Sequence, residues 1–272
     1  INCTFIGDES LSIRSMSRVT KHLTKIGADV HITKKDYLPL IISGNEELLP
    51  LTHNIQKASA QIKSALILSA LNIHGKTRII ENTPTRDHTE RLLKYLNVNF
   101  KIKKLKNKKT KIELNGPYEI KSKNIEVAGD PSSASFFIVG ALIVPKSKIV
   151  LNNVLLNPSR IAFLKILKKM GGDIKIKKTK KNSGEDVGSI SARYSKLKGI
   201  NISSSQSAFL IDEYPILSIA ASQATGKTVM KGLDELRHKE SDRINSISVN
   251  LKKVGVDVKV EHDDMYIHGK KL

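Results

Sequence analysis

At 272 residues the chain is long enough for one large domain or for two of ordinary size. Its 46 Lys and Arg residues exceed its 26 Asp and Glu residues, but aromatic residues make up only 4% and Trp is absent, so the chain lacks the stacking side chains of a nucleic-acid platform. One cysteine, Cys3, excludes an intrachain disulfide, the eight His residues show no metal-ligand spacing, and the longest apolar run, 136–144, is too short to span a bilayer.

Two kinds of helix pattern alternate along the chain. The first kind is amphipathic, with apolar residues at steps of three and four, and is predicted at 16–26, 89–96, 163–170 and 244–254. A residue that tolerates the left-handed conformation follows each stripe and predicts where the helix ends: Gly27, Asn97, Gly171 and Gly255. Strand-like alternation follows three of these stops, at 28–32, 173–176 and 256–260.

The second kind of helix is rich in small residues and apolar on nearly every side, which predicts that it is buried. It occurs at 59–71, 132–144 and 215–224, and a short strand follows each copy, at 76–80, 148–151 and 227–230. The whole unit consists of a buried helix, a strand, a basic loop, an amphipathic helix and further strands. It recurs roughly every 70–80 residues, in about three and a half copies, and predicts an α/β (α+β) protein built from repeats.

The composition changes near residues 127–130, where a Lys-rich region gives way to Gly129, Asp130 and Pro131. We expect a domain boundary there. Residues 1–127 would form an N-terminal-side domain of about one and a half to two repeat units, and residues 128–272 a C-terminal-side domain of about two.

A basic residue stands in the loop before each amphipathic helix: Arg14, Arg86, Arg160 and Arg243. Each is expected near a helix N-terminus, where exposed amide groups and the helix dipole already favour anions. We expect several of these helix starts to converge on one cleft that binds a polyanion.

Two segments of the second half carry side chains suited to acid–base chemistry. Lys239, Glu240 and Arg243 could belong to a solvated helix start with charge pairs, or could bind an anion and move a proton. Asp212 follows three apolar residues, so it is either the N-cap of the helix near Pro215 or a partly buried acid with a perturbed pKa. The residues by themselves leave both alternatives open in each case.

Two segments of the first half look at first like ordinary helix starts. In 58–65 the cap would be Ser59, although Gln61 and Lys63 are unusual in an otherwise apolar helix. Residues 84–90 predict a second helix start of the capping-box type. Taken singly, each segment has a sound structural explanation.

In their order and wording, however, these four segments together resemble the 5-enolpyruvylshikimate-3-phosphate synthase family. Further stretches add to the resemblance, which extends over essentially all of the chain apart from its Lys-rich parts: 7–11 with Arg14, 129–134 and 157–160. It implies the enolpyruvyl transferase fold, with two domains of repeated βαβαββ units around buried helices, truncated here, that close on substrate like a hinge. The implied reaction transfers the enolpyruvyl group from phosphoenolpyruvate to the 5-hydroxyl of shikimate 3-phosphate and releases phosphate. This step of the shikimate pathway, which leads to the aromatic amino acids, uses addition and elimination and needs no metal or organic cofactor.

The resemblance also implies which residues bind the two phosphorylated carboxylates. Arg14 and Arg243 would hold phosphoenolpyruvate, and Gln61 would reach between both substrates. Ser59 and Arg86 would bind the phosphate of shikimate 3-phosphate. Such a set agrees with the general need for several cations and donors around phosphate and carboxylate groups.

Three further residues are implied to carry the chemistry. Asp212 would hold the shikimate hydroxyls and take the 5-hydroxyl proton as base, and Glu240 would give or take a proton at the enolpyruvyl methylene carbon. Lys239 would bind near the reacting hydroxyl and help to position it. Ala60 and Glu235 depart from the wording of many family members and are interpreted as markers of one branch.

The ends of the sequence suggest a piece of a longer protein. The chain starts with Ile1, after the place where the family has a Lys-Ser motif and a Gly-Thr loop, and stops at Leu272, before its Asp-His-Arg motif and a later lysine. We therefore expect a fragment that lacks both termini and that is inactive, or nearly so, by itself.

Two alternative functions remain at this stage. The sister family, which transfers enolpyruvyl to UDP-N-acetylglucosamine, shares the fold but needs a reactive cysteine in a preceding loop, and Cys3 lies in the wrong place. A non-enzymatic basic binding module is the other alternative. For the main interpretation we expect small-molecule substrates, no nucleic-acid or membrane partner, a monomer, and a cytoplasmic location because no signal peptide is evident.

Overall fold

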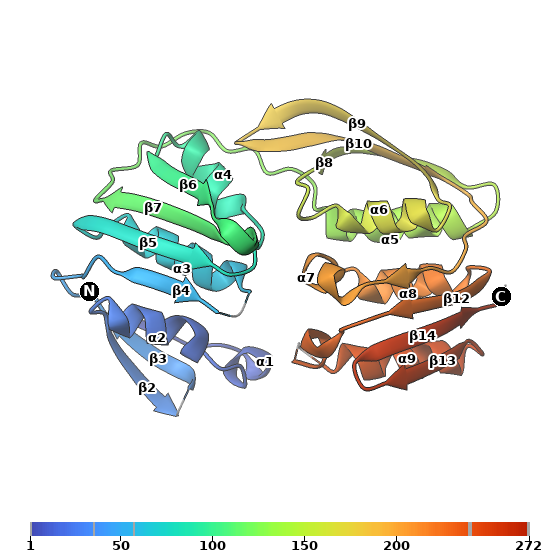
Figure 1. The fold of residues 1–272 in the computed structure, drawn as a ribbon, viewed down its shortest axis with the longest axis horizontal. Coiled ribbons are helices and arrows are strands. Elements are labelled where there is room, and N and C mark those ends of the chain that lie inside the picture. The colour runs from blue at the N-terminus through green and yellow to red at the C-terminus, as the bar shows by residue number, and fades with distance from the viewer. Residues whose placement is uncertain (1, 35, 57, 239–240, 271–272) are drawn as a thin grey trace. The chain divides into compact units, whose positions relative to one another are not determined.

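The structure, a computed structural model, describes residues 2–34, 36–56, 58–238 and 241–270. They form two compact units, Ile1–Asn124 (unit 1) and Ile125–Leu272 (unit 2), and each is described here by itself (Figure 1). The number of repeat units in each of the two domains expected from the sequence, 1–127 and 128–272, stays a prediction.

Unit 1 begins with a small antiparallel sheet of strand order β1-β3-β2. Its strands are β1 (Asn2–Phe5), β2 (Asp29–Lys34) and β3 (Tyr37–Ser43), and its helices are α1 (Glu9–Ser12) and α2 (Ser17–Lys25). Gly27, with φ of 99°, follows α2 and turns the chain into β2. The buried side chain of Ile26, only 2% exposed, belongs to the apolar stripe that the sequence predicts for this helix.

A four-stranded sheet of order β4-β5-β7-β6 makes up the rest of unit 1. Its strands are β4 (Thr52–Ile55), β5 (Gly75–Glu81), β6 (Phe100–Lys104) and β7 (Thr110–Gly116), and a short 3₁₀ helix, η1 (Lys106–Lys108), joins the last two. The parallel strands β4 and β5 are connected by α3 (Ala60–Ala70), and α4 (His88–Tyr95) connects β5 to β6. Residues of α3, α4 and three strands share one core: Ile55, Ile62, Leu66, Ile67, Ile79, Leu93 and Ile112.

Unit 2 contains a three-stranded antiparallel sheet of order β8-β10-β9. The strands are β8 (Lys148–Leu155), β9 (Asp173–Asn182) and β10 (Glu185–Arg193), and the helices are α5 (Pro131–Ile143) and α6 (Ala162–Lys169). A parallel bridge between Gly129 and Val154 adds the start of a further strand beside β8. The Lys-rich strand β9 lies at the edge of this sheet and faces solvent with most of its lysines.

The second sheet of unit 2 has the order β11-β12-β14-β13. Its strands are β11 (Asn201–Ile202), β12 (Gly226–Met230), β13 (Asp257–Glu261) and β14 (Asp264–Gly269). The helical segments are η2 (Ser204–Gln206), α7 (Ser207–Leu210), α8 (Tyr214–Ser222), η3 (Asp234–His238) and α9 (Arg243–Lys253). The first two strands are again parallel and the others antiparallel, so this sheet repeats the topology of β4-β5-β7-β6. The repeated βαβαββ unit that the sequence predicts is thereby confirmed.

The expected burial of the small-residue helices is only partly correct. In α5 the side chains of Ile138, Val139 and Leu142 are fully buried, but Phe136 and Phe137 are 56% and 62% exposed. Composition shows that such a helix is apolar on every side, but it does not show which sides another element covers. One face of α5 is therefore open to solvent in the described structure.

Candidate active-site residues

The first turn of α3 carries two of the candidate substrate-binding residues. Ser59 is the N-cap of this helix, and its Oγ accepts a hydrogen bond of 3.3 Å from the backbone N–H of Ile62. The capping role expected from the sequence is therefore confirmed. The Ser59 side chain is half-buried and that of Gln61 is exposed, so both stand at the open N-terminal end of the helix, where amide groups favour anions.

Arg86 lies in the loop that leads from the end of β5 to the start of α4. The helices α3 and α4 are hydrogen-bonded to each other near their starts, because the hydroxyl groups of Ser64, in the second turn of α3, and Thr89, in the first turn of α4, lie 2.6 Å apart. Thr85, a residue of this loop, donates a hydrogen bond of 2.5 Å from its Oγ1 to the Glu81 carboxylate at the end of β5. The structure thus brings the segments with Ser59 and Arg86 together within unit 1.

Beneath these two helix starts lies a buried cluster of charges. The Lys63 ammonium, on a side chain only 1% exposed, is 3.2 Å from Glu81 Oε1 and 2.7 Å from Glu90 Oε1. Burial raises the pKa of Glu90, and the nearby Lys63 opposes that shift. Glu90 therefore does not act as the exposed acid of a capping box. It is an internal partner of Lys63, which the sequence marks only as unusual.

Arg14 lies between α1 and α2 in the first part of unit 1. Its guanidinium Nη2 donates to Ser10 Oγ at 3.3 Å, and its side chain is exposed. It precedes the first turn of α2, as the repeat pattern predicts, because α2 begins at Ser17. The location at a helix start is therefore confirmed, and its role toward phosphoenolpyruvate stays a prediction.

In unit 2 the structure places Asp212 beside Arg243. The Arg243 Nη1 lies 3.6 Å from Asp212 Oδ1, and the two side chains are 26% and 34% exposed. Asp212 lies between α7 and α8, and the N-cap of α8 is Glu213, so Asp212 is not the helix cap that one interpretation of the sequence proposes. Arg243 is the first residue of α9. Lys239 and Glu240 lie outside the described residues.

The cap of α9 is a residue that the sequence did not single out. Asp242 Oδ1 accepts the backbone N–H of Asn245 at 3.0 Å, and Asp242 Oδ2 pairs with Arg237 at 3.1 Å. Arg237 also donates to Asp263, in the turn between β13 and β14. These contacts fix the helix end from which Arg243 projects.

A second network supports the chain beside Asp212. The neighbouring Glu213 is 1% exposed and accepts a hydrogen bond of 2.5 Å from Ser132 Oγ, at the start of α5. Arg160 donates to the same Ser132 Oγ at 2.8 Å and to Asp130 Oδ1 at 2.7 Å. Arg160 therefore precedes α6 as the repeat predicts, and its guanidinium pairs with the carboxylate of Asp130.

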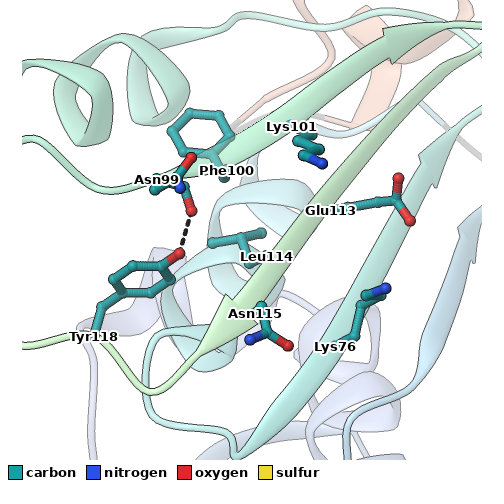
Figure 2. A pocket seen from close by; sticks show the side chains of 8 residues that line it. All are labelled: Lys76, Asn99, Phe100, Lys101, Glu113, Leu114, Asn115 and Tyr118. Carbon is teal, nitrogen blue, oxygen red and sulfur yellow. Dashed lines mark hydrogen bonds between the residues drawn. The ribbon is translucent and has the colours of Figure 1, made fainter.

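A pocket of about 190 Å³ lies over β5, β6 and β7 in unit 1, and none of the predicted site residues line it (Figure 2). Two of its sides are Lys76 and Lys101, and Tyr118 closes one end by donating to the Asn99 carbonyl oxygen. Glu113 lies in the wall of this pocket, and hydrogen bonds from Lys111 and then from Arg78 lower the pKa of its carboxyl group. Internal pairs thus occupy much of its polar lining.

Among residues 2–34, 36–56, 58–238 and 241–270, no three His, Cys, Asp or Glu side chains gather as a metal ion would require. Within the same ranges, no helix combines the length and apolar character needed to cross a membrane.

The repeated βαβαββ units define a protein of the enolpyruvyl transferase fold. The profile of the EPSP synthase (3-phosphoshikimate 1-carboxyvinyltransferase) family matches residues 1–272, and the chain belongs to this family.

Similar proteins support the assignment. The 3-phosphoshikimate 1-carboxyvinyltransferases of Parvibaculum lavamentivorans and Clostridium tetani are each 44% identical to this chain, over 99% of it and 60% of their own length. An EPSP synthase structure from Acinetobacter baumannii superposes with a TM-score of 0.86 at 39% identity, over 100% of this chain and 60% of that one. The enolpyruvyl transferase NikO from Streptomyces tendae, with a TM-score of 0.69 and 14% identity over 98% of this chain and 60% of its own, shows the fold alone. The chain thus spans about 60% of the length of these relatives.

Proposed function

We propose that this chain takes part in the transfer of the enolpyruvyl group from phosphoenolpyruvate to the 5-hydroxyl of shikimate 3-phosphate, with release of phosphate. The observation that carries the proposal is the pairing of Asp212 with Arg243 at the start of α9. The carboxylate of Asp212, which can accept a proton, lies there next to the guanidinium of Arg243, which can bind an anion. The family match favours this reaction over transfer to a sugar nucleotide and over a non-enzymatic binding module.

In the proposed mechanism Asp212 accepts the proton of the 5-hydroxyl as its oxygen forms a bond to C2 of phosphoenolpyruvate. Glu240 delivers a proton to the methylene carbon and gives a methyl group, and Lys239 positions the hydroxyl. Elimination returns the methyl proton to Glu240 as the C2–O bond to phosphate breaks, and the leaving phosphate takes up the proton that Asp212 removed from the hydroxyl. Arg243 and Arg14 hold the phosphoenolpyruvate anion throughout.

The phosphate of the second substrate would be bound by Ser59 and Arg86, with Gln61 between the two substrates. The support is geometric, because the hydrogen bond between Ser64 and Thr89 joins α3 and α4 near their N-terminal ends, and a helix N-terminus favours anions. All of this chemistry uses side chains and needs no metal or organic cofactor. We further expect a monomer that works in the cytoplasm on these two small molecules.

The test uses the protein expressed from the complete reading frame that contains these residues. Phosphate release with both substrates should require Asp212, and Asp212→Asn should lower kcat by about a hundredfold or more. Asp173→Asn, an exposed acid at the start of β9, is the matched control and should keep full activity. Turnover of UDP-N-acetylglucosamine instead of shikimate 3-phosphate, or wild-type rates in Asp212→Asn, would refute the proposal.

The 272-residue polypeptide can be assayed separately. Because the chain spans about 60% of the length of its relatives, we expect it to be inactive or nearly so without the rest. A coupled phosphate-release assay that shows turnover by this polypeptide would contradict that expectation. Binding to random DNA at physiological salt would favour the basic-module alternative.

A further inference from the structure

The loop that carries Arg86 has a cluster of buried charges at its base. All residues from Asn82 to Thr89 are exposed or half-buried, whereas the residues that flank them, Glu81 and Glu90, are only 3% and 4% exposed. A surface loop without a buried side chain has no apolar anchor of its own and depends on the contacts at its base.

The two buried carboxylates at the base of this loop bind the same ammonium group. Lys63 Nζ lies 3.2 Å from Glu81, at the end of β5, and 2.7 Å from Glu90, in the first turn of α4. Lys63 itself belongs to the first turn of α3 and follows the cap Ser59, whose backbone oxygen accepts the Lys63 N–H at 3.2 Å. One side chain therefore joins the three elements that surround the loop.

The physical effect of such a cluster is geometric more than energetic. A buried ion pair adds little net stability compared with well-packed apolar residues of the same volume, since desolvation offsets the attraction. Its hydrogen bonds are short and directional, so they favour one arrangement of the groups they join. Here that arrangement sets the first turn of α3 against the first turn of α4.

We propose that Lys63 is a positioning residue, which holds Ser59 and Arg86 in the one geometry that binds the phosphate group of the anionic sugar-acid substrate. This inference rests on the proposed function, because that function supplies the substrate. Lys63 does not touch the substrate, since its side chain is 1% exposed and its ammonium is occupied by the two carboxylates. Its removal should therefore affect affinity for this substrate more than the chemical step.

The experiment compares variants of the protein from the complete reading frame. Lys63→Met should raise KM for shikimate 3-phosphate by about tenfold or more, while kcat and KM for phosphoenolpyruvate stay within about twofold. Amide exchange in residues 82–88 should accelerate by a similar factor. Lys76→Met, an exposed lysine of β5, is the matched control and should change neither readout.

Two further variants keep the test decisive if Lys63→Met folds poorly. Glu90→Gln keeps the Lys63–Glu81 pair, should fold, and should raise KM for shikimate 3-phosphate by about threefold. Adding Glu90→Gln to Lys63→Met removes the repulsion between two buried carboxylates and should recover part of the lost affinity. The inference would be overturned if Lys63→Met lowered kcat by the factor expected for KM and left KM for shikimate 3-phosphate unchanged. Unchanged amide exchange in residues 82–88 would also overturn it.

Failure of the proposed function gives a different result. If the wild-type protein does not turn over shikimate 3-phosphate, the proposed function is wrong. The exchange measurement needs no substrate, so it still shows whether Lys63 fixes the Arg86 loop. Unchanged exchange in that loop would overturn the positioning role on its own.

Discussion

Replacing Ser59 with alanine and with glycine separates the capping role that the structure shows for its hydroxyl group from the substrate-binding role that we propose for it. Ser59 Oγ accepts the Ile62 N–H as the cap of α3, and its proton is left to donate to a phosphate oxygen in the proposed complex. Ser59→Ala removes both interactions. Ser59→Gly also removes the hydroxyl, but glycine is well tolerated at an N-cap.

The two losses have different sizes. An N-cap serine replaced by alanine costs about 1 kcal/mol, and the same change to glycine costs only a few tenths. For a unit of this size 1 kcal/mol lowers Tm by about 3–5 °C. A hydrogen bond to a charged phosphate is worth about 1.5–3 kcal/mol, which is roughly a 10- to 150-fold change in Kd.

The assay combines thermal unfolding with calorimetric titration of shikimate 3-phosphate, on the protein from the complete reading frame. We expect both variants to lose affinity for shikimate 3-phosphate by a similar factor. Ser59→Ala should lose more stability than Ser59→Gly. Wild-type affinity in Ser59→Gly would refute the substrate role. Unchanged Tm in Ser59→Ala would refute the capping estimate.

Three other predictions follow from contacts described above. Asp242→Ala removes the cap of α9 and should lower stability by about 1 kcal/mol in urea unfolding, whereas Asp242→Asn should keep most of it. Burial lowers the pKa of His22 and of His53 in the folded protein, so the stability that these residues contribute above about pH 6.5 should be lost as pH falls through their folded pKa values. The loss should be at most about 1.4 kcal/mol per pH unit for each histidine. His53→Leu should make stability depend less on pH in unfolding curves recorded at pH 7.5 and pH 5. Serine at Phe136 and Phe137 together should reduce the binding of a hydrophobic dye and self-association of the 272-residue polypeptide in light scattering; unchanged values would show that this face is covered.

Much of the fold follows from short-range signals in the sequence. The residues predicted to stop the amphipathic helices all adopt positive φ: Gly27 at 99°, Asn97 at 64°, Gly171 at 97° and Gly255 at 79°. These signals act within one helical turn, so they can be found without knowledge of the tertiary structure. The placement of the four arginines at helix starts follows for the same reason.

The candidate site was less predictable where distant residues decide the outcome. Lys63 forms a buried ion pair with Glu81, which is 18 residues away, and no local sequence pattern links the two residues. Arg160 and Arg243 occupy equivalent places in the repeat, and each pairs with a carboxylate far upstream that no local pattern indicates, Arg160 with Asp130 and Arg243 with Asp212. The roles of Lys239 and Glu240 stay predictions.

Among the described strands, every sheet is assembled from one uninterrupted stretch of chain. The four sheets take their strands from residues 2–43, 52–116, 148–193 and 201–269, in that order. The described strands of each sheet can therefore pair as soon as their own stretch has left the ribosome. The short loops at 44–51 and 194–200, which lie between these stretches, are consequently places where an inserted peptide should disturb strand pairing least.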